Sequence, residues 1–176
     1  MEPECVPGAI LRQAMEMELE GREFYLNAAG KVENRLGRSM LESLAKDEEG
    51  HHALLLQIQE GEVQAALGEC KSGYEDGAAR VRALFAEFGT KATGEIKAGT
   101  DDLEALNISM EMERRGYDLY KQAASESTDE SAAKVFLFLA DEEQKHFEVL
   151  QNMHRYLSDP ENWFLEQEQG LLDGGD

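Results

Sequence analysis

Apolar residues recur at helical spacing in four long segments of the chain. In residues 9–29 they follow the three- and four-residue steps that place side chains on one helix face: Ile10, Leu11, Ala14, Met17, Phe24, Tyr25 and Ala28. The other segments are residues 34–58, 100–124 and 131–157. Gly30 is a candidate C-terminal cap for the first segment, and Gly61 lies just beyond the second. This pattern predicts an all-α protein with four long helices.

The stretches between and beyond these segments differ in character. Residues 1–8 contain Pro3, Pro7 and Gly8 and are expected to form a flexible N-terminus. Glycines interrupt residues 61–100, where we expect one short helix at 78–88. A connection this long suits a crossover that runs the length of a helical bundle. The tail, residues 161–176, favours a short helix around its aromatic pair Trp163-Phe164.

The chain contains an internal repeat. Residues 15–29 align without a gap with residues 110–124, and both copies read Met-Glu-Met-Glu-x-x-Gly-x-x-x-Tyr-x-x-Ala-Ala. The offset is 95 residues, the difference between positions 18 and 113, and it also aligns residues 44–55 with 139–150. The first two segments therefore form a hairpin that the last two repeat. Two such hairpins joined by a long crossover predict an antiparallel four-helix bundle with pseudo-twofold symmetry.

The second and fourth segments share the motif Leu-Ala-x-x-Glu-x-x-His-x-x-x-Leu. Glutamate and histidine three residues apart lie on one face of a helix, and the flanking leucines place that face inside the bundle. Glu18 and Glu113 lie on the apolar stripes of the other two segments. Six side chains are therefore expected to converge, and we predict that they bind metal: Glu18, Glu48, His51, Glu113, Glu143 and His146.

Charge and donor type define the metal that such a cluster would take. A carboxylate on a buried stripe costs several kcal/mol unless it is paired or metal-bound. Four glutamates carry four negative charges, which two divalent cations neutralise. Oxygen and imidazole donors without thiolate suit iron or manganese, and zinc would also fit. The predicted cofactor is a pair of iron ions, with manganese or zinc as alternatives.

Composition agrees with a helical protein and restricts its partners. The 176 residues suit one domain, and only 3 are proline. The net charge of −20 makes nucleic acid and anionic membrane surfaces poor partners. Cys5 and Cys70 are isolated, so neither a disulfide framework nor a rubredoxin-type site is indicated. We expect no membrane span and a reduced, cytoplasmic protein.

The motifs give the sequence a family resemblance. Over residues 9–157 it resembles the rubrerythrin-like branch of the ferritin-like superfamily, in the Glu-x₆-Tyr-x-x-Ala-Ala and Leu-Ala-x-x-Glu-x-x-His patterns. The resemblance implies that Glu48 and Glu143 bridge two irons. It makes Glu18 and Glu113 terminal ligands and gives each iron one histidine, His51 or His146. It also assigns Tyr25 and Tyr120 a catalytic role, as tyrosines that hydrogen-bond ligand carboxylates; alternatively, both are ordinary core aromatics.

Two departures from the family pattern bear on function. The resemblance implies a rubredoxin domain with cysteine pairs, and this sequence has none, so we expect a separate electron donor such as a rubredoxin-type protein. Rubrerythrins also carry an extra glutamate one turn after the third-helix ligand, where this chain has Gly116, matched by Gly21 in the first repeat. The two glycines either leave room for a ligand or permit close helix packing. In the first case, Gly116→Glu would add an oxygen ligand. The methionine pairs of the repeat are interpreted as core filler.

Three functions remain open on the sequence alone. The first is an oxidoreductase that reduces hydrogen peroxide or dioxygen, and it is expected to be a homodimer. The second is a ferroxidase or iron-storage protein. The third is a metal-stabilised helical adaptor without turnover. The visible duplication of the ligands favours the first.

Overall fold

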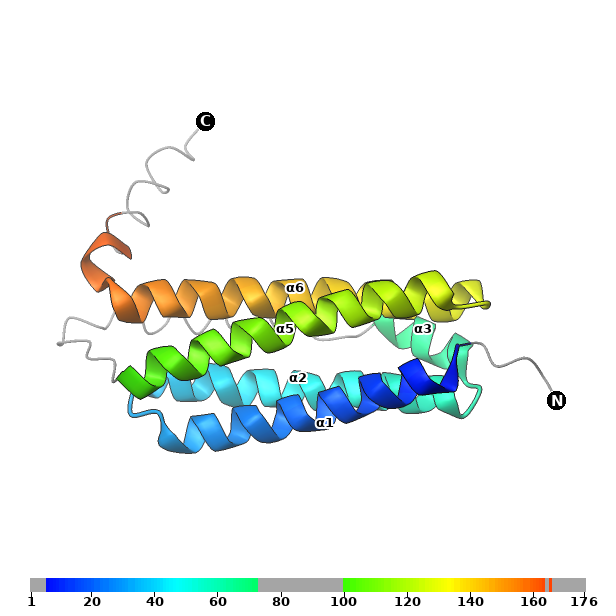
Figure 1. Ribbon diagram of the computed structural model, residues 1–176, viewed down its shortest axis with the longest axis horizontal. Helices are drawn as coiled ribbons and strands as arrows, with labels where there is room; N and C mark the ends of the chain where they lie inside the picture. The colour runs from blue at the N-terminus through cyan, green and yellow to red at the C-terminus, as the bar shows by residue number, and fades with distance from the viewer. Residues whose placement is uncertain (1–5, 73–99, 164, 166–176) are drawn as a thin grey trace.

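The computed structural model describes residues 6–72, 100–163 and 165, which are almost entirely helical (Figure 1). The helices are α1 (Gly8–Lys31), α2 (Arg35–Gln59), α3 (Val63–Ser72), α5 (Thr100–Glu126) and α6 (Glu130–Ser158). Each of the four predicted long helices is present. Their ends lie within about two residues of the predicted ones, the usual uncertainty of helix boundaries.

The four long helices form two antiparallel hairpins that pack against each other. In the first hairpin α1 packs on α2, and in the second α5 packs on α6. Contacts between α1 and α5 and between α2 and α6 join the hairpins into a bundle (Figure 1). The predicted all-α four-helix bundle is therefore confirmed. α3 and the beginning of α5 lie at opposite ends of it (Figure 1), and the short helix predicted at 78–88 lies outside the described residues.

The sequence prediction missed α3. Its glycine-rich surroundings suggested irregular structure, but Val63, Ala66 and Leu67 are buried at helical spacing, and the helix packs against α2 and α6. A glycine inside a helix costs about 1 kcal/mol relative to alanine. Gly68 faces open space, so its lack of a side chain removes no packing. Burial of the apolar face outweighs the propensity cost.

Glycine ends α2 but not α1. Gly61 has φ 83°, the left-handed conformation that glycine adopts without strain. Its N–H donates to the carbonyl of Ile58 at 3.1 Å, and the Glu62 N–H donates to the carbonyl of Gln57 at 2.7 Å, which together form a Schellman motif. The prediction that Gly30 caps α1 is wrong, because α1 continues through it to Lys31.

The core consists of two apolar clusters separated by a polar layer. One cluster gathers around Tyr25, Met40, Leu44, Leu150 and Met153, and the other around Leu55, Tyr120, Phe136 and Leu139. Val6 is buried in the second cluster, ahead of α1. Beyond α6, residues 160–163 are helical. There Trp163 packs edge-on against Tyr156 with ring centroids 5.2 Å apart, and its indole N–H donates to Asn152 Oδ1.

Among the described helices, none combines the length and the apolar character needed to span a lipid bilayer.

The α6 cap provides a test of the helix assignment. Asp129 Oδ1 accepts hydrogen bonds from the N–H groups of Ser131 and Ala132 at 2.7 and 2.9 Å. Asp129→Ala should therefore reduce the free energy of unfolding by about 1 kcal/mol, measured by urea denaturation. The control is Asp118→Ala, at an exposed position inside α5, which should not destabilise the protein. Equal stability of Asp129→Ala and wild type would contradict the capping role.

Candidate metal centre

The polar layer between the two apolar clusters is made by the six predicted ligands. Each is buried, and none exposes more than 4% of its surface. The buried face of α1 includes Ala14, Glu18, Gly21 and Tyr25, which follow one another at steps of four, three and four residues. The repeat gives α5 the same face. The Glu-x-x-His pairs of α2 and α6 then meet the two glutamates from the opposite side of the core.

Each imidazole faces several carboxylates through its Nδ1 atom. His51 Nδ1 lies 3.2 Å from Glu143 Oε1, 3.4 Å from Glu18 Oε2 and 3.5 Å from Glu48 Oε2. His146 Nδ1 lies 3.3 Å from Glu48 Oε1 and 3.5 Å from Glu113 Oε2. The two oxygens of Glu48 therefore face different histidines. This is the arrangement required of a carboxylate that bridges two metal ions.

The donors form two candidate metal positions that share one carboxylate. Glu18, Glu48, His51 and Glu143 offer ligand atoms that all lie within 4.8 Å of one another, and so do Glu48, Glu113 and His146. Glu48 belongs to both sets, as predicted for a bridging residue. Glu143 belongs to the first set only, so its bridging role stays a prediction.

The chemistry of the cluster fits bound cations. One oxygen on each of the four glutamates has no hydrogen-bond donor among the described residues, although each lies in a buried site. Buried carboxylates without compensation cost free energy, which coordination to a cation would offset. The cluster contains no thiolate, which suits iron, manganese or zinc.

Two tyrosines connect the hairpins at this site. The Tyr25 hydroxyl donates to Glu113 Oε1, and the Tyr120 hydroxyl donates to Glu18 Oε1. Each tyrosine thus supports the glutamate of the other hairpin and leaves the second oxygen of that glutamate facing an imidazole. Burial and the adjacent glutamates raise the pKa of both phenols well above the usual range, so both remain donors. Their predicted catalytic role stays a prediction.

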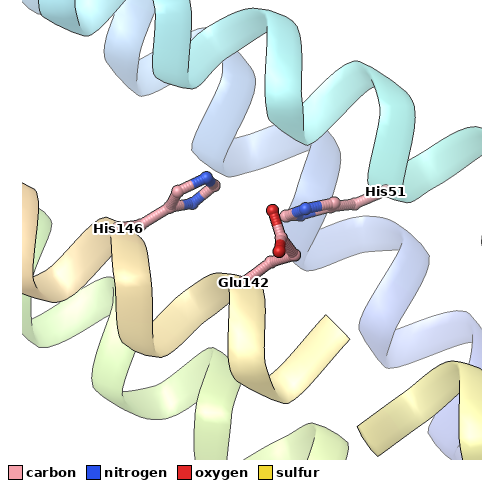
Figure 2. A group of neighbouring side chains, drawn as sticks. All are labelled: His51, Glu142 and His146. Carbon is pink, nitrogen blue, oxygen red and sulfur yellow. The ribbon is translucent and has the colours of Figure 1, made fainter. Parts of the chain in front are cut away.

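Two buried carboxylates that sequence reasoning missed lie close to the histidines. Asp47 Oδ2 lies 3.5 Å from His146 Nε2. Glu142 has a ligand atom within 4.8 Å of both imidazoles, and Figure 2 shows its carboxylate between the two rings. Its Oε1 also accepts a hydrogen bond from Lys145 Nζ at 2.8 Å. A carboxylate beside the outer nitrogen of a ligand histidine orients the ring and fixes its tautomer.

The repeat contained a signal for these two residues. Asp47 and Glu142 are equivalent under the 95-residue offset, the difference between their positions, and each directly precedes a predicted ligand glutamate. An acidic residue directly before the ligand glutamate in both copies of the motif was therefore a signal that these two positions belong to the site.

A comparison with protein-family models matches residues 9–154 to the rubrerythrin model. The chain belongs to the rubrerythrin family. This is a ferritin-like di-iron family, which agrees with the predicted resemblance and with a cluster able to hold metal.

Among solved structures, a hypothetical protein from Pyrococcus furiosus is similar to this rubrerythrin-family chain. The TM-score is 0.59 at 18% sequence identity, and the match covers 85% of this chain and 89% of the other. At this identity the similarity shows a shared fold. A search of curated proteins found no match.

The buried groups of the cluster shift one another's pKa values in opposite directions. Burial and the nearby charge of Glu48 raise the pKa of Glu18 well above its usual range, and burial together with Glu113 does the same for the pKa of Glu143. Burial opposes ionisation of Glu48 too, but the neighbouring Glu18 and the two imidazoles, each within 3.5 Å of its carboxylate, outweigh it and hold its pKa well below the usual range. For His146, burial lowers the pKa, but Glu113 and other carboxylates more than offset this and raise it.

The two repeat-related glycines have different surroundings. A Cβ atom at position 116 would lie 2.5 Å from Glu143 Oε2 and 3.0 Å from its Cδ, whereas one at position 21 would make ordinary contacts of 3.6 to 3.8 Å with Glu48. A side chain at position 116 would therefore have to displace the Glu143 carboxylate, and the interpretation of Gly116 as a vacant ligand position, filled by Gly116→Glu, stays a prediction. The carboxylate of Glu143 occupies the space above Gly116.

The metal-free protein should become more stable on mild acidification. The pKa values of Glu18, Glu143 and His146 are raised in the folded protein. Each group therefore contributes its full stability below its unfolded pKa, which is about 4.3 for glutamate and about 6.5 for histidine. That contribution is lost as pH rises through the folded pKa values. The lowered pKa of Glu48 makes its contribution to stability fall, not rise, in acid, but that contribution is lost only below about pH 4.3.

The measurement is the melting temperature of the metal-free protein, which we expect to rise as the pH is lowered from about 8 to about 5.5. Metal-loaded protein is the control. It should melt higher than the metal-free form, by an amount that grows with metal concentration, and should lose stability in acid because protons compete for the ligands. A melting temperature that changes neither with mild acid nor on addition of metal would overturn this account of the cluster.

The glycines provide a matched pair of variants. Gly116→Ala should lower the free energy of unfolding by ~1–3 kcal/mol, because the Glu143 carboxylate, which is buried and lies 3.2 Å from His51 Nδ1, must give up its position. Gly21→Ala should be neutral or stabilising by up to about 1 kcal/mol, because alanine favours a helix and the new methyl group fits. Urea denaturation of both metal-free variants measures the difference. Equal effects would mean that the two sites are equally open.

Proposed function

We propose that this chain is a non-haem di-iron oxidoreductase that reduces hydrogen peroxide or dioxygen with electrons from a separate donor protein. The observation that carries the proposal is the pair of buried donor sets that share Glu48. Family membership supports iron as the metal. A rubredoxin-type protein suits the role of donor, and the active form is proposed to be a homodimer.

The six donors divide into roles within this proposal. Glu48, whose two oxygens face different histidines, would hold both metal ions, and Glu143 would be a second ligand shared by them. Glu18 and Glu113 would be terminal ligands, and His51 and His146 would each hold one metal through Nδ1, the nitrogen that faces the carboxylates. Two iron ions, when bound, would supply the two electrons that reduce an O–O bond.

The surrounding residues keep these donors in place. Tyr25 and Tyr120 each donate to one oxygen of a terminal glutamate, which leaves the other oxygen for metal. Asp47 lies beside the outer nitrogen of His146, Glu142 lies between the two rings, and both carboxylates help to orient the imidazoles. The two apolar clusters on either side exclude water, so the carboxylates prefer a cation to hydration.

Metal content and peroxide turnover test the proposal together. Wild type loaded with ferrous iron should bind two metal ions per chain and reduce peroxide to water over repeated cycles in the presence of a reduced donor. Glu48→Ala should lower metal occupancy at both positions, measured by elemental analysis, because it removes the ligand that they share. The control is Glu49→Ala, the neighbouring residue, whose side chain is 68% exposed.

The outcome separates the three candidate functions. Consumption of peroxide in proportion to donor supports the oxidoreductase. Accumulation of a ferric mineral without donor turnover would indicate storage instead. Iron binding with neither activity would indicate a structural role, and full metal occupancy in Glu48→Ala would refute the ligand assignment.

A further inference from the structure

One ion pair beside the metal centre uses a lysine that the first hairpin does not have at the equivalent position. Lys145 Nζ donates to Glu142 Oε1 at 2.8 Å and lies 2.8 Å from Asp141 Oδ2. The 95-residue offset of the repeat, the difference between positions 50 and 145, places Gly50 where the second hairpin has this lysine. The lysine therefore distinguishes two halves of a site whose proposed ligands are the same in both.

The lysine reaches a buried carboxylate from the surface. The Lys145 side chain is 33% exposed, whereas the Glu142 side chain is 2% exposed. Among the described residues, Lys145 is the only hydrogen-bond donor to Glu142, whose second oxygen, Oε2, is buried without a donor. A charge-assisted hydrogen bond to one oxygen fixes the position of the whole carboxylate. Oε2 is thereby left for another partner.

The repeat identifies His51 as that partner. Asp47 of α2 lies 3.5 Å from Nε2 of His146 on α6. Glu142 of α6 is the counterpart of Asp47, and His51 of α2 is the counterpart of His146. Glu142 has a ligand atom within 4.8 Å of the His51 imidazole, and Figure 2 shows its carboxylate between the two rings. Because Nδ1 of His51 faces the ligand glutamates, Nε2 is the nitrogen that remains for Glu142.

We propose that Lys145 is a positioning residue that holds Glu142 against His51 and thereby strengthens metal binding at the position that His51 serves. This inference deepens the proposed function and rests on its assignment of the metal ligands. A carboxylate beside the outer nitrogen of a ligand histidine fixes the ring and makes it a stronger donor, and loss of such a partner typically lowers metal affinity by about 10- to 100-fold. Lys145 acts one step further out, because it determines where that carboxylate lies.

The lysine makes the two metal positions unequal. At the His51 position it anchors the outer carboxylate, and at the His146 position Gly50 replaces it. A glutamate side chain has one more rotatable bond than an aspartate side chain, so fixing Glu142 costs more conformational entropy than fixing Asp47. An anchor therefore matters more for Glu142. We expect the two positions to bind metal in two distinguishable steps.

The first test is a calorimetric titration of the metal-free protein with cobalt(II), which follows ferrous iron in the order of affinity for such donors. Lys145→Ala should weaken one binding step by about 10-fold or more and leave the other within about 3-fold of wild type. Lys145→Arg should restore the affinity, because a guanidinium group also donates to carboxylates. The control is Lys134→Ala, which removes an exposed ion pair with Glu130 from the same helix and should bind cobalt as wild type does.

The second test asks whether Lys145 acts through Glu142. Glu142→Gln keeps the shape of the side chain without the carboxylate and should weaken the same step. Lys145→Ala in that background should cause little further loss, because the lysine no longer has a carboxylate to hold. Asp141→Ala removes the other partner of the lysine, a side chain 63% exposed, and should leave cobalt binding close to wild type. Additive losses in the double variant, or an equal loss in Asp141→Ala, would overturn the role of Glu142.

The outcomes separate this inference from the proposed function. A wild type that binds fewer than two cobalt ions refutes the ligand assignment, and the inference falls with it. Two bound ions with unchanged affinity in Lys145→Ala, or an equal weakening of both steps, overturn the inference alone. Neither result depends on peroxide turnover, which tests the proposed function separately.

Discussion

The burial of four carboxylates at the centre of a helical bundle is the constraint on which the rest of this structure depends. Glu18, Glu48, Glu113 and Glu143 lie between two apolar clusters, where charge is costly and water is scarce. The protein meets this cost with groups that hold the carboxylates in position: two imidazoles within 3.5 Å and two tyrosine hydroxyls. These contacts and the raised pKa values of Glu18, Glu143 and His146 offset only part of the charge, and metal cations would offset the rest.

Pseudo-twofold symmetry organises this cluster, and the departures from it are informative. The ligands, tyrosines and outer carboxylates obey the repeat, since each has a counterpart in the other hairpin. The space above the glycines does not, because Glu143 approaches Gly116 more closely than Glu48 approaches Gly21. Lys145, which pairs with Glu142, corresponds to Gly50 in the first hairpin. The two metal positions are therefore similar in their direct ligands and different in their surroundings.

Much of the fold and of the cluster was predictable from sequence because both depend on periodicity. Helical spacing located the long helices, and the repeat placed Glu18 and Glu113 on the same faces as buried apolar residues. What escaped prediction depends on distances between helices. α3 was missed because Gly61 and Gly68 look alike in sequence, although one ends a helix and the other lies inside one. The crowding at Gly116 depends on the position of a side chain from α6, which no local pattern encodes.

The crossed tyrosine bonds have a consequence for how such a protein arises. Tyr25 serves the glutamate of the second hairpin, and Tyr120 serves that of the first. A single hairpin would hold a Glu, a Glu-x-x-His pair and a tyrosine whose acceptor lies on another copy. Two identical hairpins would therefore satisfy one another as a symmetric dimer, with every contact made twice. Fusion of two such genes would preserve the contacts within one chain and free each half to change independently, as the differing surroundings of Gly21 and Gly116 illustrate.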